Sequence, residues 1–259
     1  MNPTGRPKRR DCLESIDVLV LAGGLGTRVA AVLGDKPKLL ASVGARPYIA
    51  HLIDWLDSFG ARRIVLGLGH LAGPVLAYLE TNPQPGLEIE PVIEPFPLGT
   101  AGAIRFARDR LKSDPVMVIN GDSLVDADLC HLIDRHRNAG KLGTLLCTAV
   151  EDTSRYGRVV IDSQQHISGF VEKDANSHTS GTISAGVYLL SARLLDDIAD
   201  HSYTSLERDV FAHQPPGALT ALVGRYRFID IGTPETLKHV DEYFDHDFLN
   251  NIKINKYPE

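Results

Sequence analysis

The sequence from Ile16 to Arg28 reads Ile-Asp-Val-Leu-Val-Leu-Ala-Gly-Gly-Leu-Gly-Thr-Arg. Its first part, Ile16–Ala22, is rich in branched apolar residues and has the length of a buried strand. Three glycines then fall within four residues. Because glycine lacks a Cβ, backbone N–H groups in such a loop can approach an anion closely. Arg28 adds a planar cation suited to phosphate. The stretch predicts a strand and a phosphate-binding loop, although glycines also form tight turns.

Two common nucleotide-binding signatures do not match this loop. A P-loop requires Lys-Ser or Lys-Thr after its last glycine, and neither pair follows here. A dinucleotide-binding loop requires a third glycine where this chain has Val29. A Rossmann oxidoreductase is therefore a weak alternative.

Strands and helices alternate in the first half of the chain. Strands are predicted at Ile16–Ala22, Arg63–Leu68, Leu87–Ile93 and Val116–Ile119. Helices are predicted at Pro47–Phe59, Gly73–Glu80, Thr100–Leu111 and Asp128–Ala139. This order is typical of a parallel sheet covered on both faces. Ligands of such sheets bind at the carboxyl ends of the strands, so we expect the site in the loops after Ala22, Ile93 and Ile119.

The second half is richer in strands, which we expect to extend the same sheet. They are predicted at Leu142–Val150, Arg158–Ile161, His166–Val171, Thr182–Leu190, Ala218–Val223 and Arg227–Ile231. A last helix is predicted at Pro234–Phe244, with Thr233 as its N-cap. We expect a flexible tail at 1–15, one domain at 16–245 and a C-terminal extension at 246–259.

Composition excludes several classes of protein. The 259 residues carry a net charge of −6 and are 43% hydrophobic, which is ordinary for a globular protein. The acidic pI near 5.9 argues against a nucleic-acid-binding protein. No apolar run reaches the roughly 20 residues of a membrane span, and no secretory signal is evident. The three cysteines form no Cys-x-x-Cys pair, which favours reduced thiols and a cytoplasmic location.

Further motifs follow the glycine loop in a fixed order. They are Lys36-Pro37-Lys38, Gly99-Thr100-Ala101-Gly102-Ala103, Asn120-Gly121-Asp122, Gly169-Phe170-Val171-Glu172-Lys173, Ala185-Gly186-Val187-Tyr188 and Asp230-Ile231-Gly232-Thr233-Pro234. In this order the set resembles the sugar-1-phosphate nucleotidyltransferases. It is most similar to the guanylyltransferases that act on mannose 1-phosphate or D-glycero-D-manno-heptose 1-phosphate. The resemblance implies a three-layer, Rossmann-like α/β fold of the glycosyltransferase-A type, with a mixed, mostly parallel sheet.

The resemblance also implies a reaction and a set of residues. A nucleoside monophosphate passes from a nucleoside triphosphate, most simply GTP, to a sugar 1-phosphate, and pyrophosphate leaves. The implied catalytic residues are Arg28, Lys38 and Asp122, and Asp122 and Asp230 would share Mg²⁺. The implied nucleotide-binding residues are Leu21, Ala22, Gly23, Gly24, Gly26, Thr27, Arg28, Gly99 and Thr100. Those implied for the sugar phosphate are Gly157, Glu172, Lys173 and Ser184.

The sequence leaves several choices open. Ser184 stands where the family commonly has Asn, so hexose and heptose remain alternatives. Glu94 could accept hydrogen bonds from guanine, although an ordinary loop carboxylate is the simpler interpretation. The same reaction with UTP, dTTP or CTP and a hexose 1-phosphate is an alternative, as is a non-catalytic regulatory subunit. Nucleic acid is not expected as a partner, and whether the chain forms a homo-oligomer is open.

Overall fold

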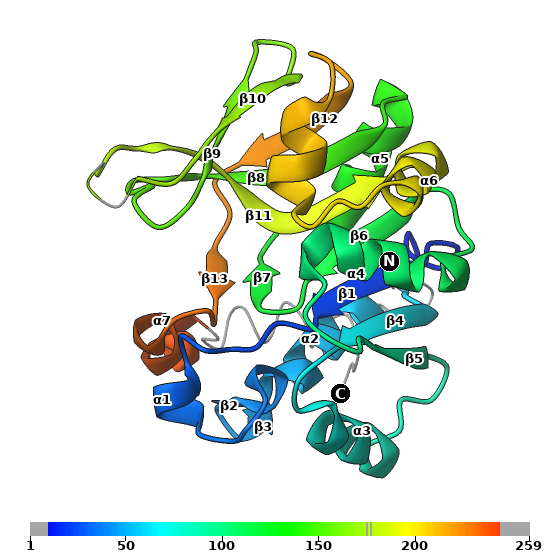
Figure 1. Ribbon diagram of the computed structural model, residues 1–259, viewed down its shortest axis with the longest axis vertical. Helices are drawn as coiled ribbons and strands as arrows, with labels where there is room; N and C mark the ends of the chain where they lie inside the picture. The colour runs from blue at the N-terminus through cyan, green and yellow to red at the C-terminus, as the bar shows by residue number, and fades with distance from the viewer. Residues whose placement is uncertain (1–9, 175, 177, 244–259) are drawn as a thin grey trace, which may run out of the picture.

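The computed structural model describes residues 10–174, 176 and 178–243. The expected C-terminal extension and residues 1–9 of the expected tail lie outside the described residues. Within the described part, nine strands form one sheet in the order β10-β9-β11-β6-β1-β4-β5, with β8 beside β11 and β12 beside β8 (Figure 1). These strands are β1 (Val18–Ala22), β4 (Arg63–Leu68), β5 (Glu88–Ile93), β6 (Val116–Asn120), β8 (Gly143–Val150), β9 (Arg158–Ile161), β10 (Ile167–Val171), β11 (Gly181–Leu190) and β12 (Leu219–Gly224).

Helices and short strands connect the sheet. The α-helices are α1 (Ala30–Leu33), α2 (Tyr48–Ser58), α3 (Ala72–Thr81), α4 (Gly99–Ala107), α5 (Leu129–Ala139), α6 (Ala192–Asp200), α7 (Pro234–Lys238) and α8 (Val240–Tyr243). Tighter or wider helical turns are η1 (Lys38–Leu40), η2 (Arg108–Arg110), η3 (Leu206–Val210) and η4 (Phe211–His213). Two small two-stranded sheets pair β2 (Ser42–Val43) with β3 (Arg46–Pro47), and β7 (Ser123–Val125) with β13 (Phe228–Asp230). None of the helices in the described part is long and apolar enough to cross a membrane.

The topology confirms the predicted fold class. Strand β1 lies in the middle, parallel to β4 on one side and to β6 on the other. The second half of the chain extends this sheet as predicted, because β11 pairs antiparallel with β6 and with β8. The carboxyl ends of β1 and β6 are therefore neighbours, and the Gly121 N–H donates to the Leu21 carbonyl at 2.8 Å.

Alternate residues of the central strands face two separate hydrophobic cores. On one face, Val18 and Val20 pack with helices α2, α3 and α5. On the other face, Leu19 packs with α4 and α6. This is the period-two alternation of a strand, and it produces the expected three layers.

Element ends differ from the sequence prediction in a few places. Strands β4 and β9 have the predicted bounds, and Thr233 caps α7 in a reciprocal capping box with Thr236. The predicted last helix is divided at His239 into α7 and α8. Helix α6 was not predicted, although its cap is of the expected type, because the Ser191 side chain accepts from the Leu194 N–H at 3.3 Å.

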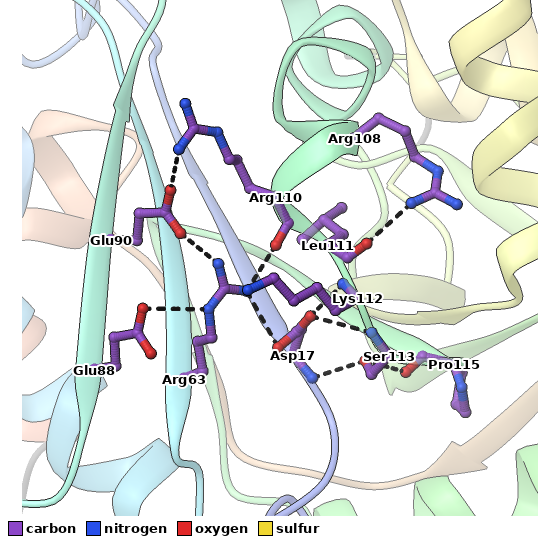
Figure 2. Close-up of polar contacts among 10 residues, drawn as sticks. All are labelled: Asp17, Arg63, Glu88, Glu90, Arg108, Arg110, Leu111, Lys112, Ser113 and Pro115. Atoms are coloured by element: carbon purple, nitrogen blue, oxygen red, sulfur yellow. Dashed lines mark hydrogen bonds and ion pairs between the residues drawn. The ribbon is translucent and has the colours of Figure 1, made fainter.

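A polar network lies at the amino ends of the central strands, away from the glycine loop (Figure 2). Arg63 of β4 pairs with Asp17 at 3.2 Å and also with Glu90 of β5. Asp17 in turn accepts from the backbone N–H groups of Lys112, at 2.5 Å, and Ser113, at 3.1 Å. These contacts connect β1, β4, β5 and the segment that leads into β6. The network therefore supports the order of the strands.

The cysteines correct the sequence prediction. Cys12 and Cys130 form a disulfide with a Cα–Cα distance of 5.5 Å, so the prediction of reduced thiols was wrong for this pair. Cys147 is free and buried. The bond could not be read from local spacing, because its two cysteines are separated by 118 residues. Leu13 beside it is fully buried, so the described part of the expected tail packs against the core.

Reducing this disulfide is expected to destabilise the fold. A cross-link over 118 residues restricts the unfolded chain, so its loss should lower the free energy of unfolding. The expected loss is roughly 2–5 kcal/mol. Urea unfolding of the wild type with and without dithiothreitol measures this difference. A Cys12→Ser/Cys130→Ser double variant is the control, and dithiothreitol should leave its stability unchanged. Equal stability of the oxidised and reduced wild type would contradict the expectation.

Candidate active site

A cavity of about 620 Å³ lies at the carboxyl ends of β1 and β6. Its volume is typical of a small-molecule site. The walls come from the glycine loop, the segment that leads into η1 and the start of α4. All of the predicted nucleotide-binding residues except Arg28 line it, namely Leu21, Ala22, Gly23, Gly24, Gly26, Thr27, Gly99 and Thr100. The predicted catalytic residues Lys38 and Asp122 line it as well.

Arg28 lies beside this cavity rather than in its lining. Its neighbours Thr27 and Val29 are both lining residues, whereas Arg28 itself is exposed to solvent. An exposed guanidinium at this position is free to turn toward an anion that enters the cavity. Its catalytic role stays a prediction.

Glu94 is a buried carboxylate in the cavity wall. The sequence could not distinguish it from a solvated loop carboxylate. Its exposed fraction is 7%, and it accepts a hydrogen bond from the Leu98 N–H at 3.1 Å. Burial raises the pKa of the Glu94 carboxyl. A Cβ on Gly23 would overlap this carboxyl group, which explains a glycine at that position. Glu94 can therefore accept hydrogen bonds from a ligand inside the cavity.

The two predicted metal-binding aspartates lie side by side. Asp122 follows β6, and Asp230 ends β13, which pairs with β7 so that Asp230 lies opposite Ser123. The Ile231 N–H also donates to the Asp122 carbonyl at 2.9 Å. A Cβ on Gly232 would be 2.8 Å from Asp230 Oδ1 and 3.8 Å from Asp122 Oδ2. The two carboxylates therefore face one common space.

Each aspartate is paired with a cation. Lys38 Nζ is 2.9 Å from Asp122 Oδ2, and Arg155 Nη2 is 3.1 Å from Asp230 Oδ2. Buried Tyr48 lies close to both carboxylates: burial first, and then their charges, raise the pKa of its hydroxyl. Sequence reasoning missed Arg155, because a charged residue in a loop carries no signal of what it contacts. Two carboxylates and two cations thus converge at one place.

The pair of aspartates fits a magnesium ion. Mg²⁺ binds through one or two carboxylates and completes its coordination with water and substrate phosphates. The described residues are 10–174, 176 and 178–243. Among them, no group of three or more His, Cys, Asp or Glu side chains could hold a metal ion by itself. The two carboxylates would supply part of the coordination of such an ion, and the cavity beside them leaves room for water and phosphates as its other ligands.

The predicted sugar-phosphate residues come from β11 and from the segments just before β9 and just after β10, outside the lining of the cavity. Ser184 Oγ and Tyr188 Oη are 3.2 Å apart, and Tyr188 donates to Glu207 Oε1 at 3.2 Å. Burial raises the pKa of Glu207, and the charge of Glu172 raises it further, so these acidic groups are near each other. Glu207 was missed because it lies in a charged run that resembles a solvated surface.

The other two members of the predicted sugar-phosphate set are less closely connected. Gly157 runs close to β10, since a Cβ there would be 3.3 Å from the Val171 carbonyl oxygen. Lys173 is exposed at the end of β10. The structure therefore brings together Glu172, Ser184 and Glu207, while the role of Lys173 stays a prediction.

Comparison with known proteins agrees with this geometry. Residues 17–237 match a family model described as nucleotidyl transferase. The chain belongs to the nucleotidyl transferase family. HddC from Yersinia pseudotuberculosis is similar in structure, with a TM-score of 0.79, 33% identity and coverage of 89% of this chain and 100% of HddC. HddC has also been solved in complex with GMP-PN.

The curated relatives of this chain include proteins named guanylyltransferase. A mannose-1-phosphate guanylyltransferase of Mycobacterium tuberculosis is 33% identical over 227 residues, which is 85% of this chain and 62% of the relative. The mannose-1-phosphate guanylyltransferase catalytic subunit beta of Xenopus tropicalis is 33% identical over 222 residues, 84% of this chain and 61% of the relative. This nucleotidyl transferase therefore spans about three fifths of the length of these curated relatives.

Substituting Gly23 should disturb the wall of the cavity in the nucleotidyl transferase. In Gly23→Ala, the new Cβ displaces the Glu94 side chain, so nucleoside triphosphate binding is expected to weaken at least about tenfold. Gly73→Ala is a matched control outside the lining of the cavity, because nothing lies within 4 Å of a Cβ there. Isothermal titration with GTP gives both affinities. Equal affinity of the two variants would show that the Gly23–Glu94 contact does not shape the site.

Proposed function

We propose that this nucleotidyl transferase moves a guanylyl group from GTP to a sugar 1-phosphate, with release of pyrophosphate. The observation that carries the proposal is the convergence of Asp122, Asp230 and Lys38 beside the cavity formed by the glycine loop. The names of the guanylyltransferase relatives and the HddC complex with GMP-PN support guanine as the base. Mannose 1-phosphate and D-glycero-D-manno-heptose 1-phosphate are the proposed acceptors.

The proposed reaction joins two anions, so the protein must position them and balance their charge. An oxygen of the sugar phosphate forms a bond to the α-phosphorus of GTP, and the bond from that phosphorus to the β-phosphate bridging oxygen breaks. Backbone N–H groups of the glycine loop bind the phosphates. Lys38 offers its charge at the reaction centre, and Arg28 stabilises the departing pyrophosphate.

Asp122 and Asp230 would hold Mg²⁺ in this proposal. The chemistry supplied there would be that of a Lewis acid beside the phosphates, which draws electron density from phosphorus. The side chain of Asp122 is 33% exposed and that of Asp230 is 13% exposed, so both can be reached from the solvent side.

Glu94 is the residue proposed to recognise the base by hydrogen bonding. Guanine presents an N1–H and an exocyclic amine as donors, and a buried carboxylate can accept both. Adenine presents its exocyclic amine but an acceptor at N1, so it could not satisfy both acceptor oxygens of the carboxylate. Burial of Glu94 thus supports guanine over adenine.

The acceptor sugar is proposed to bind along β9, β10 and β11. Glu172, Ser184 and Glu207 supply hydroxyl and carboxylate groups for sugar hydroxyls, while Gly157 lets the sugar touch the backbone. Lys173 would pair with the sugar phosphate. A cytoplasmic location stays a prediction, and we propose that the product serves polysaccharide assembly.

A panel of triphosphates against sugar 1-phosphates tests the proposed function. GTP with heptose or mannose 1-phosphate should release pyrophosphate faster than ATP, UTP, dTTP or CTP does. Asp122→Asn should lower turnover by about 100-fold, because a neutral amide is a poorer magnesium ligand than a carboxylate. Asp126→Asn is the control, since Asp126 is exposed at the end of β7 and should tolerate the change. If every combination of triphosphate and sugar 1-phosphate binds without releasing pyrophosphate, the result would favour a regulatory subunit and contradict the proposal.

Changing Glu94 tests how the base is read. Glu94→Gln exchanges one acceptor oxygen for a donor, so the KM for GTP should rise at least about tenfold while the KM for ATP changes little.

In the wild type, lowering the pH through the raised pKa of Glu94 protonates the carboxyl, so GTP affinity should fall at a higher pH than for an ordinary carboxylate. Affinities measured over a pH series should show this dependence in the wild type alone. The same profile in Glu94→Gln would assign the titration to another group.

A further inference from the structure

Arg155 lies on the loop between β8 and β9 and binds both carboxylate oxygens of Asp230. Its Nη2 is 3.3 Å from Asp230 Oδ1 and 3.1 Å from Asp230 Oδ2. The guanidinium also lies over the ring of Tyr156, 5.3 Å from the centroid. The Arg155 side chain is 40% exposed, whereas that of Asp230 is only 13% exposed. A partly exposed guanidinium therefore covers a largely buried carboxylate.

Two neutral donors bind the same carboxylate. The Tyr156 hydroxyl donates to Asp230 Oδ2 at 2.5 Å, and the Gly232 N–H donates to Asp230 Oδ1 at 2.9 Å. Neutral donors orient a carboxylate and leave its charge available to a metal ion. A guanidinium at the same oxygens is different, because its full charge repels a second cation. Arg155 and a divalent ion therefore cannot both contact the Asp230 carboxylate without repelling each other.

We propose that Arg155 is the resident counter-cation of Asp230 in the metal-free protein, and that a divalent cation displaces it. The inference rests on the proposed function, because it takes Asp230 as a metal ligand. Lys38 makes a similar pair with Asp122, but its side chain is less exposed, at 21%, and it lines the cavity. Arg155 is thus the cation better placed to leave.

Displacement would couple metal binding to the loop that carries Arg155. That loop continues through Tyr156 to Gly157, one of the residues proposed to contact the sugar. Arg155 is therefore a positioning residue, which acts through Asp230 and through the loop rather than on the reacting atoms.

Titration of the nucleotide-free protein with Mn²⁺, with free Mn²⁺ followed by electron paramagnetic resonance, tests this displacement. Arg155→Gln should bind Mn²⁺ about two- to fivefold more tightly, because the partly exposed ion pair that it removes is a weak one. Arg158→Gln removes the same charge from an exposed arginine at the start of β9, and it should leave the affinity unchanged. Tyr156→Phe retains the cation and removes a neutral donor, so it should not tighten binding.

Thermal unfolding gives a second readout that does not depend on activity. Without a competing guanidinium, saturating Mn²⁺ should raise the Tm of Arg155→Gln more than that of the wild type. Asp230→Asn should remove the Mn²⁺ response in both assays.

The outcomes separate the inference from the proposed function. If Asp230→Asn loses Mn²⁺ while Arg155→Gln binds like the wild type or more weakly, the displacement is wrong and the metal site stands. If Arg158→Gln tightens binding as much as Arg155→Gln, net charge explains the effect and the displacement is again wrong. If the wild type shows no Mn²⁺ binding that depends on Asp230, the proposed metal site fails together with the inference.

Discussion

The short antiparallel pairing of β7 with β13 is the constraint on which the site depends. It joins the end of the first half of the chain to a segment near its end, and it sets Asp230 beside Asp122. Two carboxylates so close together repel each other unless cations compensate their charge. Lys38 and Arg155 supply those cations in the metal-free protein. The same electrostatic demand is what a magnesium ion and its phosphates would satisfy.

The rest of the fold keeps this place accessible and fixed. Parallel pairing of β1 with β6 puts the glycine loop and Asp122 at the same edge of the sheet. At the opposite edge, Arg63 and its carboxylate partners connect the strands through closely paired charges (Figure 2). The ion pairs at the amino ends of the strands therefore stabilise the fold, whereas the charged groups at the carboxyl ends can bind a ligand.

Local patterns were sufficient to predict much of this structure. The central strands are apolar runs bounded by turn residues, and the alternation of strands with helices fixed their parallel order. The capping residue of α7 was predicted by the same local chemistry. The approach of Asp122 to Asp230, by contrast, came only from the order of motifs shared with a family. Nothing in the spacing of two residues so far apart predicts that they meet.

The site residues and the disulfide that sequence reasoning missed are set by long-range packing. The Cys12–Cys130 bond needs the N-terminal segment to reach α5, and burial of Glu207 needs the turn η3 to pack below Tyr188. Arg155 became visible only as the partner of Asp230. In each case the residue type is ordinary, and its meaning comes from a neighbour that the folded chain provides.

The central claim is that Asp122 and Asp230 act together on one ion. Anomalous diffraction from crystals of the protein grown with Mn²⁺ and a non-hydrolysable GTP analogue tests it most directly. The account predicts a manganese peak coordinated by carboxylate oxygens of both residues and by the analogue's phosphates. A peak bound elsewhere, or an ion that contacts the phosphates with neither aspartate, would contradict it.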